Sequence, residues 1–316
     1  MCCLFGLYDY ENCLSVKTKE EIIRVLSKEC EDRGTDATGI AYLNGDKMTI
    51  YKRPLPAHKM KFRFRGNPSV IMGHTRMTTQ GSEKNNYNNH PFYSTKLNYA
   101  LAHNGILSND ISLRKSEKLS KTKIQTDSYI AVQLIDSQNT LSFDSLKYMA
   151  EKVEGSFCFT VLSGNNELYI VKGDNPMCIV HFKGFYIYAS TTTILSKALD
   201  RLGIKKWKKL DLITIDEGEI LKIDVFGNIS KNKFKFSHSY LYNYPVTRWD
   251  RGSKYISKVE DDYLQTLIYY GELAGIDENI ILTLLDYGYD YMDIEELIYN
   301  PELLSGYYKD EFCTEI

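Results

Sequence analysis

Short apolar segments of strand length follow one another along most of this chain. Four of them occupy residues 155–163, 167–173, 177–184 and 185–190, and only brief turns separate them. Apolar and aromatic runs bounded by turn residues are typical of β-strands. Strands joined by such short connections pair antiparallel, because parallel neighbours need a long crossover between them. The sequence therefore predicts antiparallel sheet over this region.

The remaining segments also favour a fold built mainly of β-strands, with a few helices. Strands are expected at residues 2–8, 69–76 and 97–105, as a hairpin with an Asn-Gly-Asp turn over 39–52, and as two more over 212–230. Helical spacing of apolar residues predicts a helix at 18–31, a second at 127–136 capped by Thr126 and Asp127, and a third at about 191–202. Mostly strands with a few helices favours an α+β fold of two antiparallel sheets with helices outside.

The last part of the chain differs in charge from the rest. Residues 261–316 hold 14 acidic residues and a single basic one, Lys309, although the whole chain has a net charge of only −2. This asymmetry indicates a separate acidic module. We expect one domain over residues 2–235, a linker over 236–259 that contains Pro245 and Gly252, and an acidic helical region over 260–316. Three short helices are expected there, at 261–275, 277–288 and 293–304.

Composition also limits the class of protein. The apolar runs are all shorter than the ~20 residues that span a bilayer, and the start does not resemble a secretory signal. The seven cysteines are irregularly spaced and form no CxxC pair, which indicates reduced thiols and not a disulfide framework. Basic residues are dispersed along the chain. We therefore expect a cytoplasmic protein that binds neither membrane nor nucleic acid.

The second residue of the chain is a cysteine. Removal of Met1, which a small second residue favours, would leave Cys2 with both a thiol and a free α-amine. An α-amine titrates near ~8, so it can accept the proton of its own thiol. Nucleophile and base would then belong to one residue. From this position alone, a buried strand start is the simpler interpretation.

Other short stretches bear on this choice. They are "RGTDATGIA" at 33–41, "GHTRMTTQG" at 73–81, "NNHPF" at 88–92, "AHNGILSN" at 102–109 and "TDSYIA" at 126–131. With Cys2, and in this order, they resemble the class II glutamine amidotransferase domains, which are N-terminal-nucleophile hydrolases. The likeness covers roughly residues 2–230. It implies a four-layer αββα sandwich, with Cys2 at the edge of one sheet beneath the loop of residues 77–90.

The resemblance also implies a role for particular residues. Cys2 would attack the side-chain amide of L-glutamine, and Asn104 with the Gly105 backbone N–H would hold the oxyanion. Substrate contacts would come from Arg76 to the α-carboxylate, Asp127 to the α-ammonium, and Thr79 near the carboxylate. Four further residues are expected to support the site structurally: Arg33, Asp36, His74 and His103.

The resemblance is incomplete. Cys3, Met77 and Gln80 stand where the family commonly has glycine, tryptophan and histidine, and Tyr129 replaces a frequent glutamate. Motifs of an ammonia-using synthase are absent from the sequence, so a stand-alone glutaminase domain is expected, with ammonia passed to a separate partner synthase. The alternatives are a free hydrolase of a γ-glutamyl amide and an inactive binding module.

No cofactor or metal is expected. The histidines at 74, 90 and 103 lack the close HxxxH or HxH spacing that favours a zinc site. Hydrogen bonds to loops in the core are the simpler role for them.

Overall fold

The computed structural model describes residues 2–204, 211–236 and 275–286, and the helical positions 264, 267, 268, 271, 294, 297 and 298. The chain divides into two compact units, residues 1–241 and 242–316. Apart from residue 236, the linker expected over 236–259 lies outside the described residues.

Two antiparallel sheets make up most of the first unit. The seven-stranded sheet has the order β11 (Asp211–Ile213), β9 (Cys178–Phe182), β10 (Phe185–Ala189), β1 (Cys3–Asp9), β4 (Val70–Arg76), β2 (Ala37–Asn44) and β3 (Lys47–Arg53). The six-stranded sheet has the order β13 (Ile229–Lys233), β12 (Glu219–Ile223), β8 (Leu168–Lys172), β7 (Gly155–Ser163), β6 (Tyr99–Leu107) and β5 (Phe92–Ser94). Neighbouring strands pair antiparallel in both sheets, as the sequence predicts.

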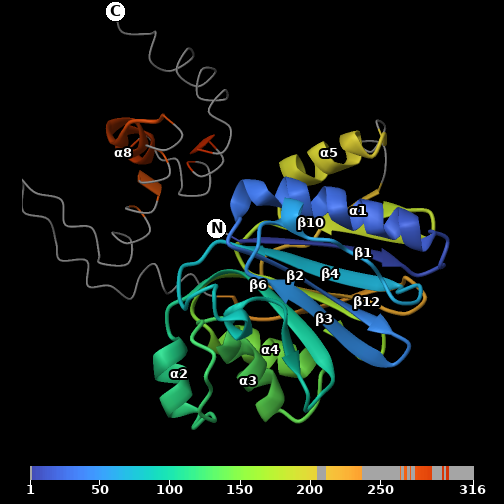
Figure 1. The fold of residues 1–316 in the computed structure, drawn as a ribbon. Coiled ribbons are helices and arrows are strands. Elements are labelled where there is room, and N and C mark those ends of the chain that lie inside the picture. The colour runs from blue at the N-terminus through green and yellow to red at the C-terminus, as the bar shows by residue number, and fades with distance from the viewer. Residues whose placement is uncertain are drawn as a thin grey trace, which may run out of the picture. The chain divides into compact units, whose positions relative to one another are not determined.

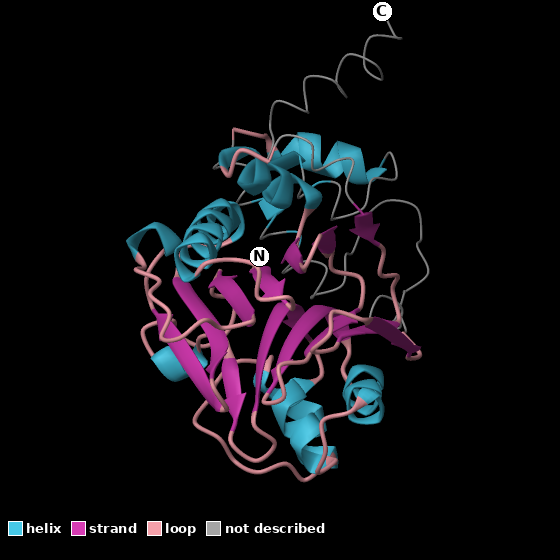
Figure 2. Ribbon diagram, turned by 90° about the vertical axis from the view of Figure 1, so that its right-hand side faces the viewer, coloured by secondary structure: helices cyan, strands magenta, loops and turns pink. Residues whose placement is uncertain are grey.

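Helices cover the outer faces of the two sheets. They are α1 (Val16–Glu29), α2 (Asp110–Ser116), α3 (Tyr129–Ser137), α4 (Phe143–Lys152) and α5 (Thr192–Arg201), with 3₁₀ turns η1 (Cys30–Arg33), η2 (Ala57–Lys59) and η3 (Asn86–Asn88). Figure 1 shows α1 and α5 on one side of the strands and α3 and α4 on the other. Figure 2 shows the strands between these helical layers. The αββα sandwich is confirmed.

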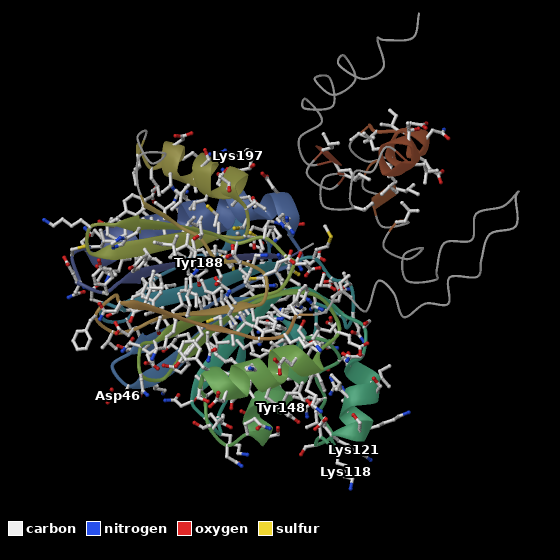
Figure 3. All side chains as sticks on the ribbon, turned by 180° about the vertical axis from the view of Figure 1, so that it is seen from behind. Asp46, Lys118, Lys121, Tyr148, Tyr188 and Lys197 are labelled. Atoms are coloured by element: carbon white, nitrogen blue, oxygen red, sulfur yellow. The ribbon has the colours of Figure 1, made fainter. Side chains whose placement is uncertain are left out.

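Three apolar cores hold these layers together. One lies under α1 and α5, a second under α3 and α4, and the third between the sheets. Tyr188, fully buried, belongs to the third core, and Figure 3 shows it deep among the strands. Burial of apolar side chains on both faces of each sheet is the main favourable term in such a fold.

Several element boundaries differ from the sequence prediction. Helix α1 begins at Val16 and not at Thr18, because the Ser15 hydroxyl accepts a hydrogen bond from the Thr18 N–H at 3.1 Å and caps the helix. Helices α2 and α4 are absent from the sequence prediction. Helix α4 has a capping box made by Ser142 and Ser145, with serine in place of the usual Glu or Gln.

The cap predicted for α3 is also different. The Asp127 side chain does not cap that helix, since its carboxylate accepts a hydrogen bond from the Leu107 backbone N–H at 2.7 Å. This bond ties the start of α3 to the end of β6.

The second unit is described in part. Helix α8 (Glu278–Asp286) confirms the middle one of the three helices expected there, and Asp277 accepts a hydrogen bond from the Asn279 N–H at its start. The other two expected helices lie largely outside the described residues. Within the residues that the structure describes, the helices are too short or too polar to cross a membrane.

Candidate functional site

Cys2 immediately precedes β1, a strand inside its sheet with β10 and β4 on either side. It therefore lies at the end of an interior strand, and not on an edge strand. Cys3 pairs with Thr75 of β4, and one further step of this register places Cys2 opposite Arg76. The Cys2 thiol lies 3.5 Å from the Met77 carbonyl oxygen. The strand register thus brings the cysteine and the arginine together at the start of the 77–90 loop.

The electrostatic surroundings of Cys2 join three of the predicted residues. Burial raises the pKa of the Cys2 thiol, and the charge at the amino terminus, the Met77 backbone and Arg76 lower this pKa. Asp127 raises the same pKa. Because each charge affects the thiol, Cys2, Arg76 and Asp127 form one electrostatic cluster.

Arg33 and Asp36 support the backbone around this cluster. Arg33 is buried, and its Nε donates to the Cys2 carbonyl oxygen at 3.1 Å. The Asp36 carboxylate accepts from the Thr78 N–H at 2.7 Å, while its own N–H donates to the Arg76 carbonyl at 2.9 Å. These bonds fix the residue before β1 and the first turn after β4.

Arg76 is a buried residue whose guanidinium contacts the loop that follows it. Nη1 donates to the Asn89 side-chain oxygen at 2.7 Å. Nη2 donates to two backbone carbonyls, those of Gln80 at 2.6 Å and Gly81 at 2.8 Å. Burial lowers the pKa of Arg76, whereas Cys2 and Asp127 raise it. An arginine keeps its charge under these conditions, so this loop folds around a buried cation.

Asp127 joins the same loop to the second sheet. Its backbone N–H donates to the Gln80 side chain at 2.9 Å, and one carboxylate oxygen accepts from the Leu107 N–H. The other oxygen accepts from the Ser128 hydroxyl at 3.2 Å. Gln80 therefore contacts Arg76 through its backbone and Asp127 through its side chain.

Asn104 and Gly105 lie in β6, which packs against β1 and β4. The Asn104 side chain is fully buried, and neither its Oδ1 nor its Nδ2 atom has a hydrogen-bond partner among the described residues. An unpaired buried amide costs about 1–3 kcal/mol. Gly105 has a φ of +139°, which side chains rarely adopt. The Asn104 amide is thus a buried polar group without a partner among the described residues, beside a backbone position that favours glycine.

The predicted histidines lie close together in the core. His74 Nε2 is 2.9 Å from the His103 carbonyl oxygen, and His103 Nδ1 is 2.8 Å from the Ser128 hydroxyl. The His74 and His90 rings are 4.2 Å apart between centroids, a contact that sequence spacing did not reveal. Burial lowers the pKa of His74 to about 3 and also lowers the pKa of His90 and His103. All three are neutral at pH 7, consistent with a structural role for His74 and His103.

The described part of the chain contains no group of three or more His, Cys, Asp or Glu side chains that could hold a metal ion. Such groups are the usual protein ligands of metal ions.

Some residues at the site were given no role from sequence. In the sequence, Gln80 is only a departure from the family pattern, and Asn89 is only part of "NNHPF". Thr79, expected near the substrate, is exposed, whereas its neighbour Thr78 has a buried hydroxyl without a partner among the described residues. Adjacent threonines give no sequence signal that would separate them, because only the path of the loop decides which one is buried.

Comparison with known proteins bears on the family of this chain. A family model described as a glutamine amidotransferase domain matches residues 74–205, a range that includes Arg76, Asn104 and Asp127. Glutamine–fructose-6-phosphate aminotransferase (isomerizing) of Staphylococcus aureus strain Mu50 is 27% identical over 239 residues, covering 72% of this chain and 38% of the relative. The same enzyme of Staphylococcus epidermidis strain ATCC 35984 is 31% identical over 200 residues, covering 60% and 32%. The chain thus spans about a third of the length of these relatives.

Two solved structures share the fold. The Bacillus subtilis glutamine phosphoribosylpyrophosphate amidotransferase, complexed with ADP and GMP, matches with a TM-score of 0.57 at 21% identity, over 75% of this chain and 50% of its own. A structure described as the allosteric regulatory enzyme of purine biosynthesis matches with a TM-score of 0.60 at 22% identity, over the same shares. With the ordered motifs and the αββα sandwich, these findings lead to one assignment: the chain contains a glutamine amidotransferase domain of the class II type.

Proposed function

We propose that this chain hydrolyses the side-chain amide of L-glutamine to glutamate and ammonia through a thioester on Cys2. The observation that carries the proposal is the buried Asn104 amide without a partner among the described residues, on strand β6, which packs against β1. A polar group kept unpaired in a core needs an explanation, and a reaction intermediate that it binds supplies one.

The chemistry follows from the N-terminal position of the cysteine. Once Met1 is removed, the Cys2 α-amine takes the thiol proton and the sulfur attacks the amide carbon of glutamine. The resulting oxyanion accepts hydrogen bonds from Asn104 Nδ2 and the Gly105 N–H. Removal of one such donor typically costs 10²–10³ in kcat. The carbon–nitrogen bond then breaks, and the amine returns its proton to the departing ammonia. Water hydrolyses the thioester and releases glutamate.

Arg76 and Asp127 would hold the amino-acid end of glutamine, with Thr79 adding a hydrogen bond near the carboxylate. An α-carboxylate takes two parallel N–H bonds from an arginine fork. A guanidinium can hold a carboxylate through Nη1 and Nη2 or through Nε and Nη2, so either fork needs an N–H of Nη2. In this structure Nη2 donates to the Gln80 and Gly81 carbonyls. We therefore propose that glutamine displaces at least one of these carbonyls, and that the 77–90 loop then closes over the substrate.

The fate of the ammonia is a separate part of the proposal. The matched relatives are named as aminotransferases that pair glutamine with a second substrate. By analogy we propose that ammonia formed at Cys2 passes to an acceptor bound by a partner synthase. Production of glutamate without a partner would test the hydrolase step independently of this transfer.

Intact-mass spectrometry with and without a glutamine-like diazo-ketone tests the proposal most directly. We expect a mass lacking Met1 that gains one adduct, localised to Cys2, together with release of glutamate from L-glutamine. A chain that has lost Met1 but takes up no adduct and releases no glutamate would contradict the proposal.

A further inference from the structure

The Asn175 side chain contacts the peptide group that joins Asn104 to Gly105. This side chain is buried, and Nδ2 donates to the Asn104 carbonyl oxygen at 3.1 Å and to the Ser156 hydroxyl at 3.1 Å. Resting on the proposed function, we infer that Asn175 is a positioning residue, which fixes the Asn104–Gly105 peptide so that the Gly105 N–H is oriented for the oxyanion.

Hydrogen bonds to the Phe157 backbone anchor the turn that carries Asn175 to β7. The Gly173 N–H donates to the Phe157 carbonyl at 3.0 Å, and the Phe157 N–H donates to the Asp174 carboxylate at 2.9 Å. Lys172 Nζ donates to the Gly173 carbonyl at 2.8 Å. This turn continues the β7–β8 ladder past the end of β8. It thereby fixes the position of Asn175 relative to β6.

The peptide group couples the Asn175 contact to the orientation of the Gly105 N–H. In a trans peptide the carbonyl oxygen and the next N–H lie on opposite sides of the chain. Asn175 holds the Asn104 oxygen, so the Gly105 N–H is directed to the other side of β6. On that side β5 pairs only with Tyr99–Leu101, so the ladder has already ended.

The neighbouring residue supports this orientation. Backbone groups two residues apart on a strand are directed to the same side. The His103 carbonyl lies on the side away from β7, since His74 of the other sheet is its hydrogen-bond partner. The Gly105 N–H, two residues on, is therefore directed to the same side of β6, away from β7.

Two physical effects make Asn175 matter for the reaction. A hydrogen bond to a carbonyl polarises its amide group, which strengthens the N–H at the other end as a donor. The bond also fixes the tilt of the peptide plane before the oxyanion forms, which removes a reorganisation cost in the transition state. A Cβ on Gly105 would lie 2.7 Å from Asn175 Nδ2, so the two positions are fitted to one another.

Asn175→Ala in the processed chain tests the inference. We expect kcat for glutamine hydrolysis to fall about tenfold or more, because a donor to the oxyanion is weakened but not removed. The KM for glutamine stays within about twofold, because Asn175 does not contact the substrate. Glutamate γ-semialdehyde, which forms a tetrahedral adduct with a thiolate, is expected to inhibit more weakly by the same factor as kcat/KM falls.

Two further variants keep the test decisive. Asn175→Asp retains the volume but replaces the donor by an acceptor. If Asn175→Ala does not fold, Asn175→Asp takes its place, and its kcat is expected to fall about tenfold or more relative to wild type. Asn44→Ala, an exposed asparagine at the end of β2, serves as the matched control and keeps wild-type kinetics. Thermal unfolding of each variant checks that the fold is intact.

The outcomes separate this inference from the proposed function. A wild-type chain that hydrolyses no glutamine would contradict the proposed function itself. An active wild type, with folded Asn175 variants that keep full kcat or lose activity only through KM, would overturn the role of Asn175 and leave the proposed function standing.

Discussion

Arg76 Nη2 donates a hydrogen bond of 2.6 Å to the backbone carbonyl of Gln80, within the loop that follows its own strand. The side chain of the same glutamine accepts from the Asp127 N–H. One loop residue thus contacts both residues that are proposed to hold the amino-acid end of the substrate. The loop and the substrate are expected to compete for Arg76.

This competition predicts a change in loop protection when the substrate binds. In Cys2→Ala, which cannot turn glutamine over, hydrogen exchange of residues 77–89 is expected to change on adding glutamine, while exchange in β7 and β8 stays constant. The physical reason is that a carboxylate replaces a backbone carbonyl on Nη2. Exchange that is identical with and without saturating glutamine would show that the loop does not respond.

The neighbouring cysteines provide a matched pair of variants. Cys2→Ala is expected to abolish glutamine hydrolysis without unfolding the chain, because only the proposed nucleophile is lost. Cys3→Ala is expected to remain active but to lose about 1 kcal/mol of unfolding free energy, since Cys3 is fully buried in the core. Activity assays and urea unfolding measure the two effects, and a fully active Cys2→Ala variant would refute the mechanism.

Arg76→Lys tests the arginine fork. Lysine keeps the charge but cannot donate two parallel N–H bonds. We expect the KM for glutamine to rise about tenfold or more, with a smaller change in kcat, because the lost bonds hold the amino-acid end and not the reacting amide. Steady-state kinetics measure this, and an unchanged KM would remove Arg76 from the binding site.

The buried histidines predict a dependence of stability on pH. Burial lowers the pKa of His90 well below its ordinary value, so below about pH 6.5 the unfolded chain binds a proton that the folded chain does not. Stability contributed by this residue is therefore present above that pH and is lost as the pH falls. His90→Phe removes the titrating group, whose two ring nitrogens are buried without a partner among the described residues.

Urea unfolding of wild type and His90→Phe at pH 7.5, 6.0 and 5.0 measures this effect. The difference in unfolding free energy between variant and wild type is expected to grow in favour of the variant as the pH falls. A difference that stays constant across this range would show that His90 accepts its proton equally well in the folded state.

The order and type of most elements could be predicted from sequence, because apolar runs and turns are local signals. The hairpin of β2 and β3 has its two-residue turn at the expected Asn-Gly-Asp, and Gly45 there adopts a φ of +59°. Helix α4 lacks the usual sequence signal for a helix start, because its capping box has a serine at the third position in place of Glu or Gln. Its apolar face is recognisable only once the sheet beneath it is known.

The sequence by itself determined the antiparallel αββα architecture and the candidate residues, since strand patterns and ordered motifs are properties of the chain alone. Only the tertiary structure decided which groups meet. It directed the Asp127 carboxylate to Leu107, placed Arg76 among loop carbonyls, and brought Asn175 under the Asn104 carbonyl, 71 residues away in the sequence. Such contacts depend on strand register and loop path, which are set by packing across the whole domain and leave no local trace in the sequence.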